Sequence, residues 1–179
     1  MIFSHVIMRF FAASAALMAC ACGQILPNNA ATDLAPVGVW SLPIEQTPGR
    51  ARAKARLELG QAYFEQGQAS IAMQEIALAQ AADPQWIAVH NLKALVLESL
   101  GHSELARNSF EEALRWAQRN QSLGSEVADL QHNWGLWLCA HGFSEQAVLQ
   151  FNRAMLQPGY ALRDKTQLAM ARCPSMAKG

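Results

Sequence analysis

From residue 51 onward the chain repeats itself at a fixed spacing, and this repetition limits the possible folds more than any other feature. Five sets of small or apolar residues each occur three times, with a first step of 34 residues and a second of 41. Agreement of five sets on both steps is hard to obtain by chance. The sets are Gly60, Ala94 and Gly135; Gly67, Gly101 and Gly142; Ala72, Ala106 and Ala147; Ile76, Phe110 and Phe151; and Ala79, Ala113 and Ala154.

A helical pattern with a period of 34 residues is typical of the tetratricopeptide repeat, in which each copy is a helix–turn–helix unit. The sequence therefore predicts an all-α superhelix, because a single repeat cannot cover its own apolar face and the copies must stack. We place the domain at 51–179, with repeats at about 53–86, 87–120 and 128–161 and a partial repeat at 164–179. The extra residues 121–127 are expected to lengthen the connection between the second and third repeats.

The N-terminal residues 1–19 have the layout of a bacterial secretory signal, with Arg9 followed by the apolar run FFAASAALM at 10–18. The stretch LMAC at 17–20 resembles a lipobox, which predicts cleavage before Cys20 and a diacylglycerol on its sulfur, with an acyl group on the new N-terminus. Ala21 then favours the outer membrane, by resemblance to other bacterial lipoproteins. Two alternatives stay open, namely lipidation at Cys22 and a secreted or uncleaved protein without lipid. The pair Cys20 and Cys22 alone offers too few ligands for a metal site.

Residues 20–50 are expected to carry the lipid and form a flexible tether. The segment 23–50 is rich in Pro, Gly, Asn and Thr and shows neither helical nor strand periodicity. As a random coil, a segment of this length spans roughly 30 Å. Such a tether would hold a folded domain just off the periplasmic face of a membrane.

The composition argues against several classes of function. The chain of 179 residues has a formal net charge of +0, whereas nucleic-acid binding usually needs a basic face. The histidines are scattered over different repeats, and no nucleophile motif, metal-binding spacing or phosphate-binding loop occurs. We therefore predict a protein that is not an enzyme, uses no metal or cofactor, binds no small-molecule substrate, and acts by binding other proteins.

In a tetratricopeptide superhelix the first helix of each repeat lines the concave face, so the register identifies the side chains that face a partner. They form a mixed groove suited to a helix or an extended peptide with apolar anchors. The alternative for each residue is that it packs between repeats. The predicted groove residues are Lys54, Leu57, Gln61 and Phe64, then Asn91, Leu95 and Glu98, then Asp129, His132, Leu136 and Cys139. The apolar track among them consists of Leu57, Phe64, Leu95 and Leu136.

Cys139 and Cys173 fall on the first helices of successive repeats. Because the predicted compartment is oxidising, a disulfide between them would attach the last helix to the domain. The alternative is a pair of small buried apolar residues. A disulfide requires the two Cα atoms to lie within about 7 Å of each other.

Three stretches carry a resemblance to a known family. They are RAKARLELGQAYFEQGQ at 52–68, NWGLWLC at 133–139 and PGYALRDKTQLAMARC at 158–173, and they resemble the PilF/PilW-type lipoproteins of type IV pilus biogenesis. The family pattern ends in N-A-G-L-C where this chain has AMARC at 169–173, so only a small residue, Ala171, and the cysteine are kept. The family continues through further repeats, and the present sequence is interpreted as a member shortened within the fourth.

The resemblance implies a pilotin, a lipoprotein that escorts a secretin subunit to the outer membrane and promotes its assembly into the pilus pore. The acyl chains would carry the complex, and the groove would hold a secretin segment. Two other functions stay open. One is a general periplasmic scaffold that recruits cell-envelope enzymes, and the other is an accessory chaperone for exported cytochromes.

Overall fold

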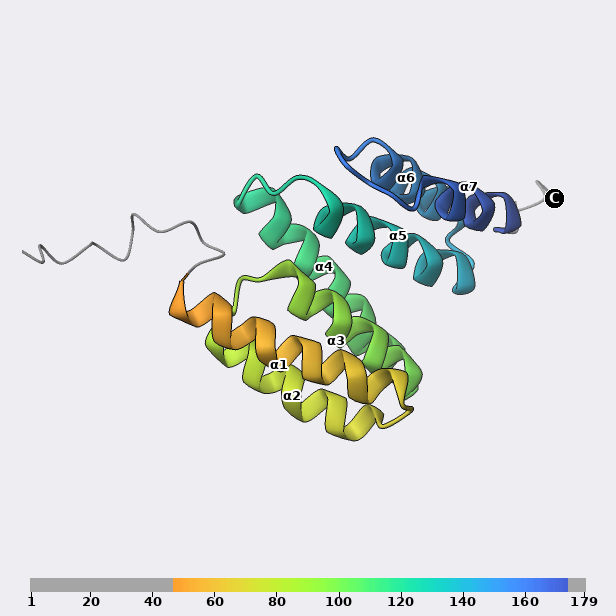
Figure 1. Cartoon of the computed structure of the whole chain (residues 1–179). Helices are drawn as coiled ribbons and strands as arrows, with labels where there is room; N and C mark the ends of the chain where they lie inside the picture. Colours follow the sequence, from red (N-terminus) through yellow and green to blue (C-terminus); the bar gives the residue numbers. More distant parts are fainter. Residues whose placement is uncertain (1–46, 174–179) are drawn as a thin grey trace, which may run out of the picture. The chain divides into compact units, whose positions relative to one another are not determined.

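The computed structural model describes residues 47–173, which form seven α-helices and no β-strand (Figure 1). The predicted all-α architecture is therefore confirmed. The helices are α1 (Pro48–Glu65), α2 (Ala69–Ala82), α3 (Ile87–Ser99), α4 (Ser103–Arg119), α5 (Ser125–Ala140), α6 (Ser144–Met155) and α7 (Arg163–Arg172). The predicted signal peptide at 1–19, the lipidation at Cys20 or Cys22 and the tether up to residue 46 lie outside the described residues.

Six of the helices form three antiparallel hairpins, and α7 follows as a single helix. The hairpins are α1 with α2, α3 with α4 and α5 with α6, and α7 packs against α6 and α5. The first helices contact one another in series, α1 with α3, α3 with α5 and α5 with α7, whereas the second helices α2, α4 and α6 do not contact each other. Because only the first helices come together, they form the inner, concave side of a superhelix.

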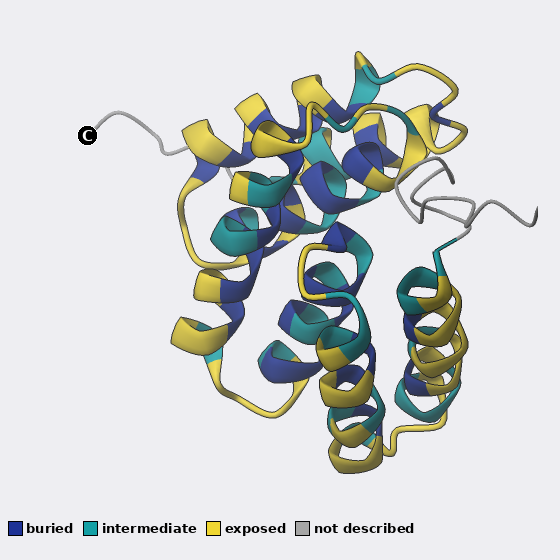
Figure 2. Ribbon diagram, turned by 90° about the vertical axis from the view of Figure 1, so that its left-hand side faces the viewer, coloured by how far each residue is buried: buried dark blue, intermediate teal, exposed yellow. Residues whose placement is uncertain are grey.

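Four of the five recurring sets of residues lie in the interior of the hairpins. Ile76, Phe110 and Phe151 occupy equivalent places in the three second helices, and each has no exposed surface. Full burial of each such side chain contributes roughly 1.5–3 kcal/mol. Figure 2 shows the buried faces of the helices turned toward one another and the exposed faces turned outward. The period of the sequence therefore records the packing between the two helices of each repeat.

In the third hairpin a glycine of α5 lies directly against an aromatic ring of α6. A Cβ atom added to Gly135 in α5 would lie 2.6 Å from Cε1 of Phe151 in α6. At the equivalent place in the first hairpin, a Cβ added to Gly60 would lie 3.4 Å from both the Ala72 carbonyl oxygen and Cγ1 of Ile76. Gly135 is thus required by packing, whereas the site at Gly60 is nearly wide enough for alanine.

The turn inside each hairpin depends on a glycine with a positive φ. Gly67, Gly101 and Gly142 have φ values of 75°, 78° and 82°, where a side chain on the residue would be strained. After α1, the amide of Gln68 donates to the carbonyl of Tyr63 at 2.9 Å and closes the helix end. These three glycines recur with the spacing of the repeats, and they therefore reverse the chain direction at the same point of every repeat.

Helix α1 begins three residues before the predicted domain boundary at 51. Thr47 caps it, because its side-chain oxygen accepts a hydrogen bond from the amide of Arg50 at 3.1 Å. Pro48 occupies the first helical position, where its missing N–H costs nothing. Residues 48–50, which were assigned to the tether, are therefore helical. The threonine–proline pair was the sequence signal that a helix begins here.

The extra residues between the second and third repeats lie mostly in helices, which corrects the prediction of a longer connection at 121–127. Helix α4 has 17 residues against 14 in α2, and α5 has 16 against 13 in α3. The segment between α4 and α5 runs only from 120 to 124. Helix formation gives the inserted backbone groups hydrogen-bond partners, which a loop would have to find elsewhere.

The single helix α7 covers the end of the third hairpin, as the sequence predicts for the partial repeat. Cys173, which follows its last turn, forms a disulfide with Cys139 in α5, and their Cα atoms are 5.5 Å apart. Thr166 is fully buried against the neighbouring helices. Within residues 47–173, no helix has the length and apolar character that crossing a membrane requires.

Candidate functional site

The concave face is built by α1, α3, α5 and α7, and all the predicted groove residues lie on the first three of these helices. Each of them is exposed or half-buried, and none is fully buried. The repeat register therefore selects side chains that reach the surface. Their surroundings differ greatly from one repeat to the next.

At the α1 end the accessible side chains are polar. Lys54 is exposed and lies 4.0 Å from Glu58 on the same helix, and Gln61 donates a hydrogen bond to Glu65 at 2.8 Å. The two apolar residues predicted here, Leu57 and Phe64, are half-buried and pack against the cluster around Ile76.

In the second repeat the predicted residues join α3 to α5. The amide of Asn133 donates to the side-chain oxygen of Asn91 at 3.3 Å. Leu95 is half-buried and packs against the larger core cluster. These two side chains therefore hold adjacent first helices together, and their contact with a partner is restricted.

Glu98 is the last predicted groove residue of the second repeat, and it is hydrogen-bonded by two residues at the end of α5. Its carboxylate accepts from Nε1 of Trp137 at 2.7 Å and lies 3.0 Å from Nε2 of His141. The His141 ring stacks on Trp137 with 4.0 Å between centroids. Burial would raise the pKa of the Glu98 carboxyl, but hydrogen bonds from His141, Trp137 and Ser103 outweigh it, so that pKa is lower than usual.

In the third repeat the predicted residues face α7. Nδ1 of His132 and the hydroxyl of Tyr160 each lie 2.7 Å from Oγ1 of Thr166. Burial lowers the pKa of His132, Lys165 lowers it further, and Asp129 acts in the opposite direction. Burial also raises the pKa of the Asp129 carboxyl, against the attraction of His132. His132 was predicted to face a partner, but it attaches the last helix.

The predicted apolar track is therefore interrupted. Leu57, Phe64 and Leu95 are half-buried, because they pack against the core clusters. Leu136 is the member of the track that stays substantially exposed, with 43% of its surface accessible. It borders a shallow pocket between α5 and α7.

The sequence analysis assigned no groove positions to the last helix and so missed the three large side chains that α7 contributes to this pocket. They are Lys165, Leu168 and Arg172, all on α7. Their spacing of three and four residues places them on one side of a helix. That spacing was the available signal, and applying the groove register to the partial repeat would have found it.

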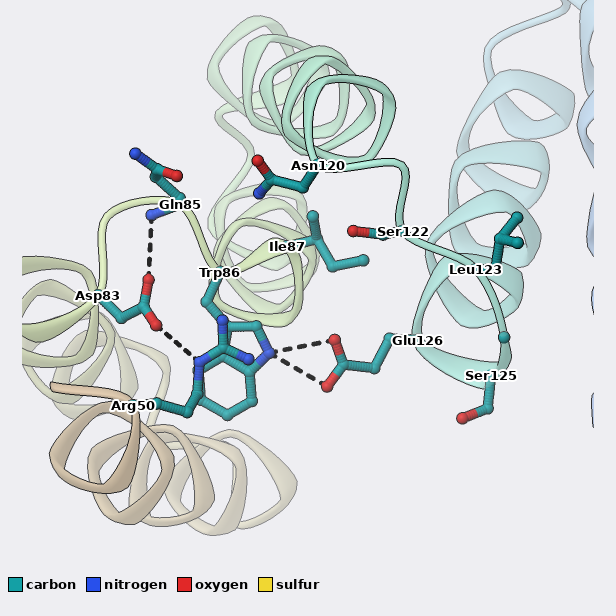
Figure 3. A pocket seen from close by; sticks show the side chains of 11 residues that line it. Arg50, Asp83, Gln85, Trp86, Ile87, Asn120, Ser122, Leu123, Ser125 and Glu126 are labelled. Atoms are coloured by element: carbon teal, nitrogen blue, oxygen red, sulfur yellow. Dashed lines mark hydrogen bonds and ion pairs between the residues drawn. The ribbon is translucent and has the colours of Figure 1, made fainter. Parts of the chain in front are cut away.

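A second cleft lies where α3 and α5 begin, away from the predicted groove residues (Figure 3). It has a volume of about 740 Å³. Trp86 stands between two charged side chains, with Arg50 stacked on its ring at 4.4 Å and both carboxylate oxygens of Glu126 at 3.1 Å from its Nε1 atom. Arg50 also pairs with Asp83 at 2.6 Å. These contacts tie α1 and the α2–α3 connection to α5.

Several histidines and carboxylates of the described residues form contacts between helices. Among residues 47–173, no group of three or more His, Cys, Asp or Glu side chains is placed to hold a metal ion. His90 is fully buried, and its Nε2 atom lies 2.7 Å from the carbonyl oxygen of Pro84, so it serves packing and the α2–α3 turn. The chemistry available on the concave face is the capture of apolar and charged groups.

Comparison with known proteins agrees with this fold. The tetratricopeptide repeat family matches residues 44–96 and again residues 87–120. An uncharacterized protein of Haemophilus influenzae is 31% identical over 108 residues, which is 60% of this chain and 56% of that protein. The solved structure of pilF from Pseudomonas aeruginosa has a TM-score of 0.61 at 22% identity, covering 68% of this chain and 52% of that one.

The chain spans little more than half the length of either relative. At 22% identity the likeness to pilF shows a shared fold. Repeats of this kind are typically scaffolds for binding other proteins. The repeat matches, the three hairpins and the inner row of first helices together show that residues 47–173 form a tetratricopeptide-repeat superhelix.

Proposed function

We propose that the protein is an outer-membrane lipoprotein adaptor that helps a secretin to reach and assemble in the outer membrane during type IV pilus biogenesis. The proposal rests on the resemblance of three sequence stretches to pilotins, and the fold shared with pilF is compatible with it. The observation that carries it is the concave face of four adjacent first helices. The lipid at Cys20, or at Cys22, holds the domain at the periplasmic face, and the groove binds a secretin segment.

The scaffold is suited to this task because its binding surface is already formed. Three hairpins with fully buried interiors, the Glu98 and His132 hydrogen bonds and the Cys139–Cys173 disulfide fix the first helices relative to one another. A preformed surface loses little conformational entropy when a partner binds. The partner segment, rather than the adaptor, is therefore the part that becomes ordered.

The function is tested by deleting the gene and measuring secretin multimers in the outer membrane together with twitching motility. We expect the deletion to reduce multimers and motility, and the wild-type gene to restore both. A deletion strain with normal multimers and normal motility would contradict the pilotin role and favour a general envelope scaffold.

The anchor is tested separately by acyl labelling of two variants. Cys20→Ser should abolish labelling and release the protein from the membrane, whereas Cys22→Ser should leave both unchanged. If the label survives in Cys20→Ser and disappears in Cys22→Ser, the lipid is on Cys22. Labelling in neither the wild type nor the variants would contradict the lipoprotein assignment.

A further inference from the structure

The pocket between α5 and α7 is a part of the concave face that is open to a partner. It has a volume of about 360 Å³. Its apolar surface comes mainly from Leu136 on α5 and Leu168 on α7, with 43% and 51% of their surfaces exposed. Single exposed leucines are common, but here two of them line one pocket from adjacent helices and give it an apolar floor between two cations.

The charges around this pocket are all positive. Lys165 and Arg172, both exposed, line it from α7, and no Asp or Glu is among its lining residues. None of the salt bridges formed within residues 47–173 involves either cation. Both side chains are therefore available for a carboxylate of another molecule.

The spacing of these groups defines what fits. Lys165 and Arg172 are seven residues apart on α7, which corresponds to a rise of about 10 Å along the helix. Leu168 lies between them in sequence. A complementary ligand has one apolar side chain between two acidic groups that are about 10 Å apart, a distance spanned by two turns of a helix.

We propose that this pocket binds an acidic amphipathic helix of a partner protein. An apolar side chain of that helix sits between Leu136 and Leu168, and acidic side chains two turns apart pair with Lys165 and Arg172. This inference rests on the proposed function, because it assumes that the concave face binds a protein, and it adds the chemical class of the segment and its place on the face.

The disulfide supports the pocket directly. Cys139 is itself a lining residue, and its bond to Cys173 fixes the end of α7 beside α5. The hydrogen bond between His132 and Thr166 fixes the same two helices about two turns before the disulfide. The spacing between Leu136 and Leu168 is thus held from both sides before a partner arrives.

The test uses the full-length chain and a library of random peptides displayed on phage. Peptides selected on the wild type should carry Asp or Glu on both sides of an apolar residue. The doubly substituted variant Lys165→Gln with Arg172→Gln should bind a selected peptide at least tenfold more weakly, and Leu168→Ala should also weaken binding. Raising the salt concentration should weaken wild-type binding, because the charges are exposed.

Arg115→Gln is the matched control, since Arg115 is an exposed cation on the second helix α4, which does not contact α7. It should leave binding unchanged, and circular dichroism should show all variants folded, because the substituted side chains are exposed. Selected peptides without acidic residues, or binding that is unaffected by the double substitution, would overturn the pocket assignment. If the double substitution abolishes binding to phosphatidylglycerol vesicles but leaves peptide binding intact, the two cations bind lipid. That result would overturn the pocket assignment as well.

Failure of the pocket and failure of the proposed function have different signatures. Suppose that peptide binding is insensitive to the α7 substitutions while the deletion strain has reduced secretin multimers. That combination would refute the pocket alone. Normal multimers in the deletion strain would refute the pilotin role, even if acidic peptides bind at α7.

Discussion

Thr166 in α7 and His132 in α5 are joined by a contact of 2.7 Å between Oγ1 and Nδ1, at a place where Thr166 has no exposed surface. The same Oγ1 atom also contacts the hydroxyl of Tyr160 at 2.7 Å and donates to the carbonyl oxygen of Leu162 at 3.1 Å. One buried hydroxyl therefore satisfies two polar side chains and positions the helix that borders the proposed pocket.

Replacing this hydroxyl should destabilise the domain. Thr166→Val keeps the side-chain shape but leaves His132 and Tyr160 without their partner, at a cost of about 1–3 kcal/mol in the free energy of unfolding. Thr166→Ser is the matched control, because it keeps the oxygen and removes only a methyl group, which costs about 1 kcal/mol. Urea denaturation compares the two, and a valine variant at least as stable as the serine variant would contradict this role.

The stability of the domain should fall as the pH is lowered through the titration of His132. Burial and Lys165 lower the pKa of His132 in the folded state, so the unfolded chain, with a pKa of about 6.5, takes up the proton first. This contribution is fully present above about pH 6.5 and is lost as the pH falls through the lower folded pKa. The raised pKa of Asp129 acts in the opposite direction, but in the range near its usual pKa of about 4.

The measurement is the thermal unfolding midpoint between pH 7.5 and pH 5, for the wild type and for His132→Asn. Asparagine can still hydrogen-bond Thr166 but does not titrate. We expect the midpoint of the wild type to decrease more steeply over this range, and parallel curves for the two proteins would show that His132 is not the group responsible.

The disulfide should contribute substantially to stability. Cys139 and Cys173 close a loop of 34 residues, for which the chain-entropy argument gives about 3–4 kcal/mol. Cys139→Ser with Cys173→Ser should therefore unfold at a clearly lower urea concentration, as should the wild type under reducing conditions. Mass spectrometry of non-reduced protein checks the bond itself, and alkylation of both thiols without reduction would contradict it.

Gly135 and Gly60 should respond differently to alanine, although they occupy the same position of their repeats. Gly135→Ala places a methyl group against the buried ring of Phe151, and overpacking of this kind costs about 1–3 kcal/mol. Gly60→Ala meets atoms at 3.4 Å, and the helix propensity of alanine offsets the tighter contact. Chemical denaturation of both variants gives the comparison, and equal effects would show that the close approach at Gly135 is relieved by movement of α6.

Sequence reasoning was successful where the structure depends on local packing. The positions of Ile76, Phe110 and Phe151, and of the turn glycines, follow from a period because each repeat packs its own two helices in the same way. The insertion after the second repeat was placed in a loop instead of in α4 and α5. A period alone cannot show whether inserted residues extend a helix or a connection, since both keep the register of the following repeat.

The groove was harder to predict because the surroundings of a first-helix side chain depend on its neighbours in other repeats. Leu95 and His132 are at suitable positions of their helices, but the adjacent first helix covers much of each. The contact between Trp86 and Glu126 joins residues 40 positions apart and has no counterpart in the repeat pattern. Such contacts are set by the distance and rotation between helices, which a single sequence does not reveal.

The central claim, that the concave face binds a secretin segment, is tested most directly by photo-crosslinking in cells. A photoreactive amino acid is placed at Leu136 on the concave face or, as a control, at Leu149 on the second helix α6. The two positions are similarly exposed, at 43% and 48%. We expect a crosslink to the secretin from position 136 and none from position 149. No secretin crosslink from 136, or equal crosslinks from both positions, would contradict it.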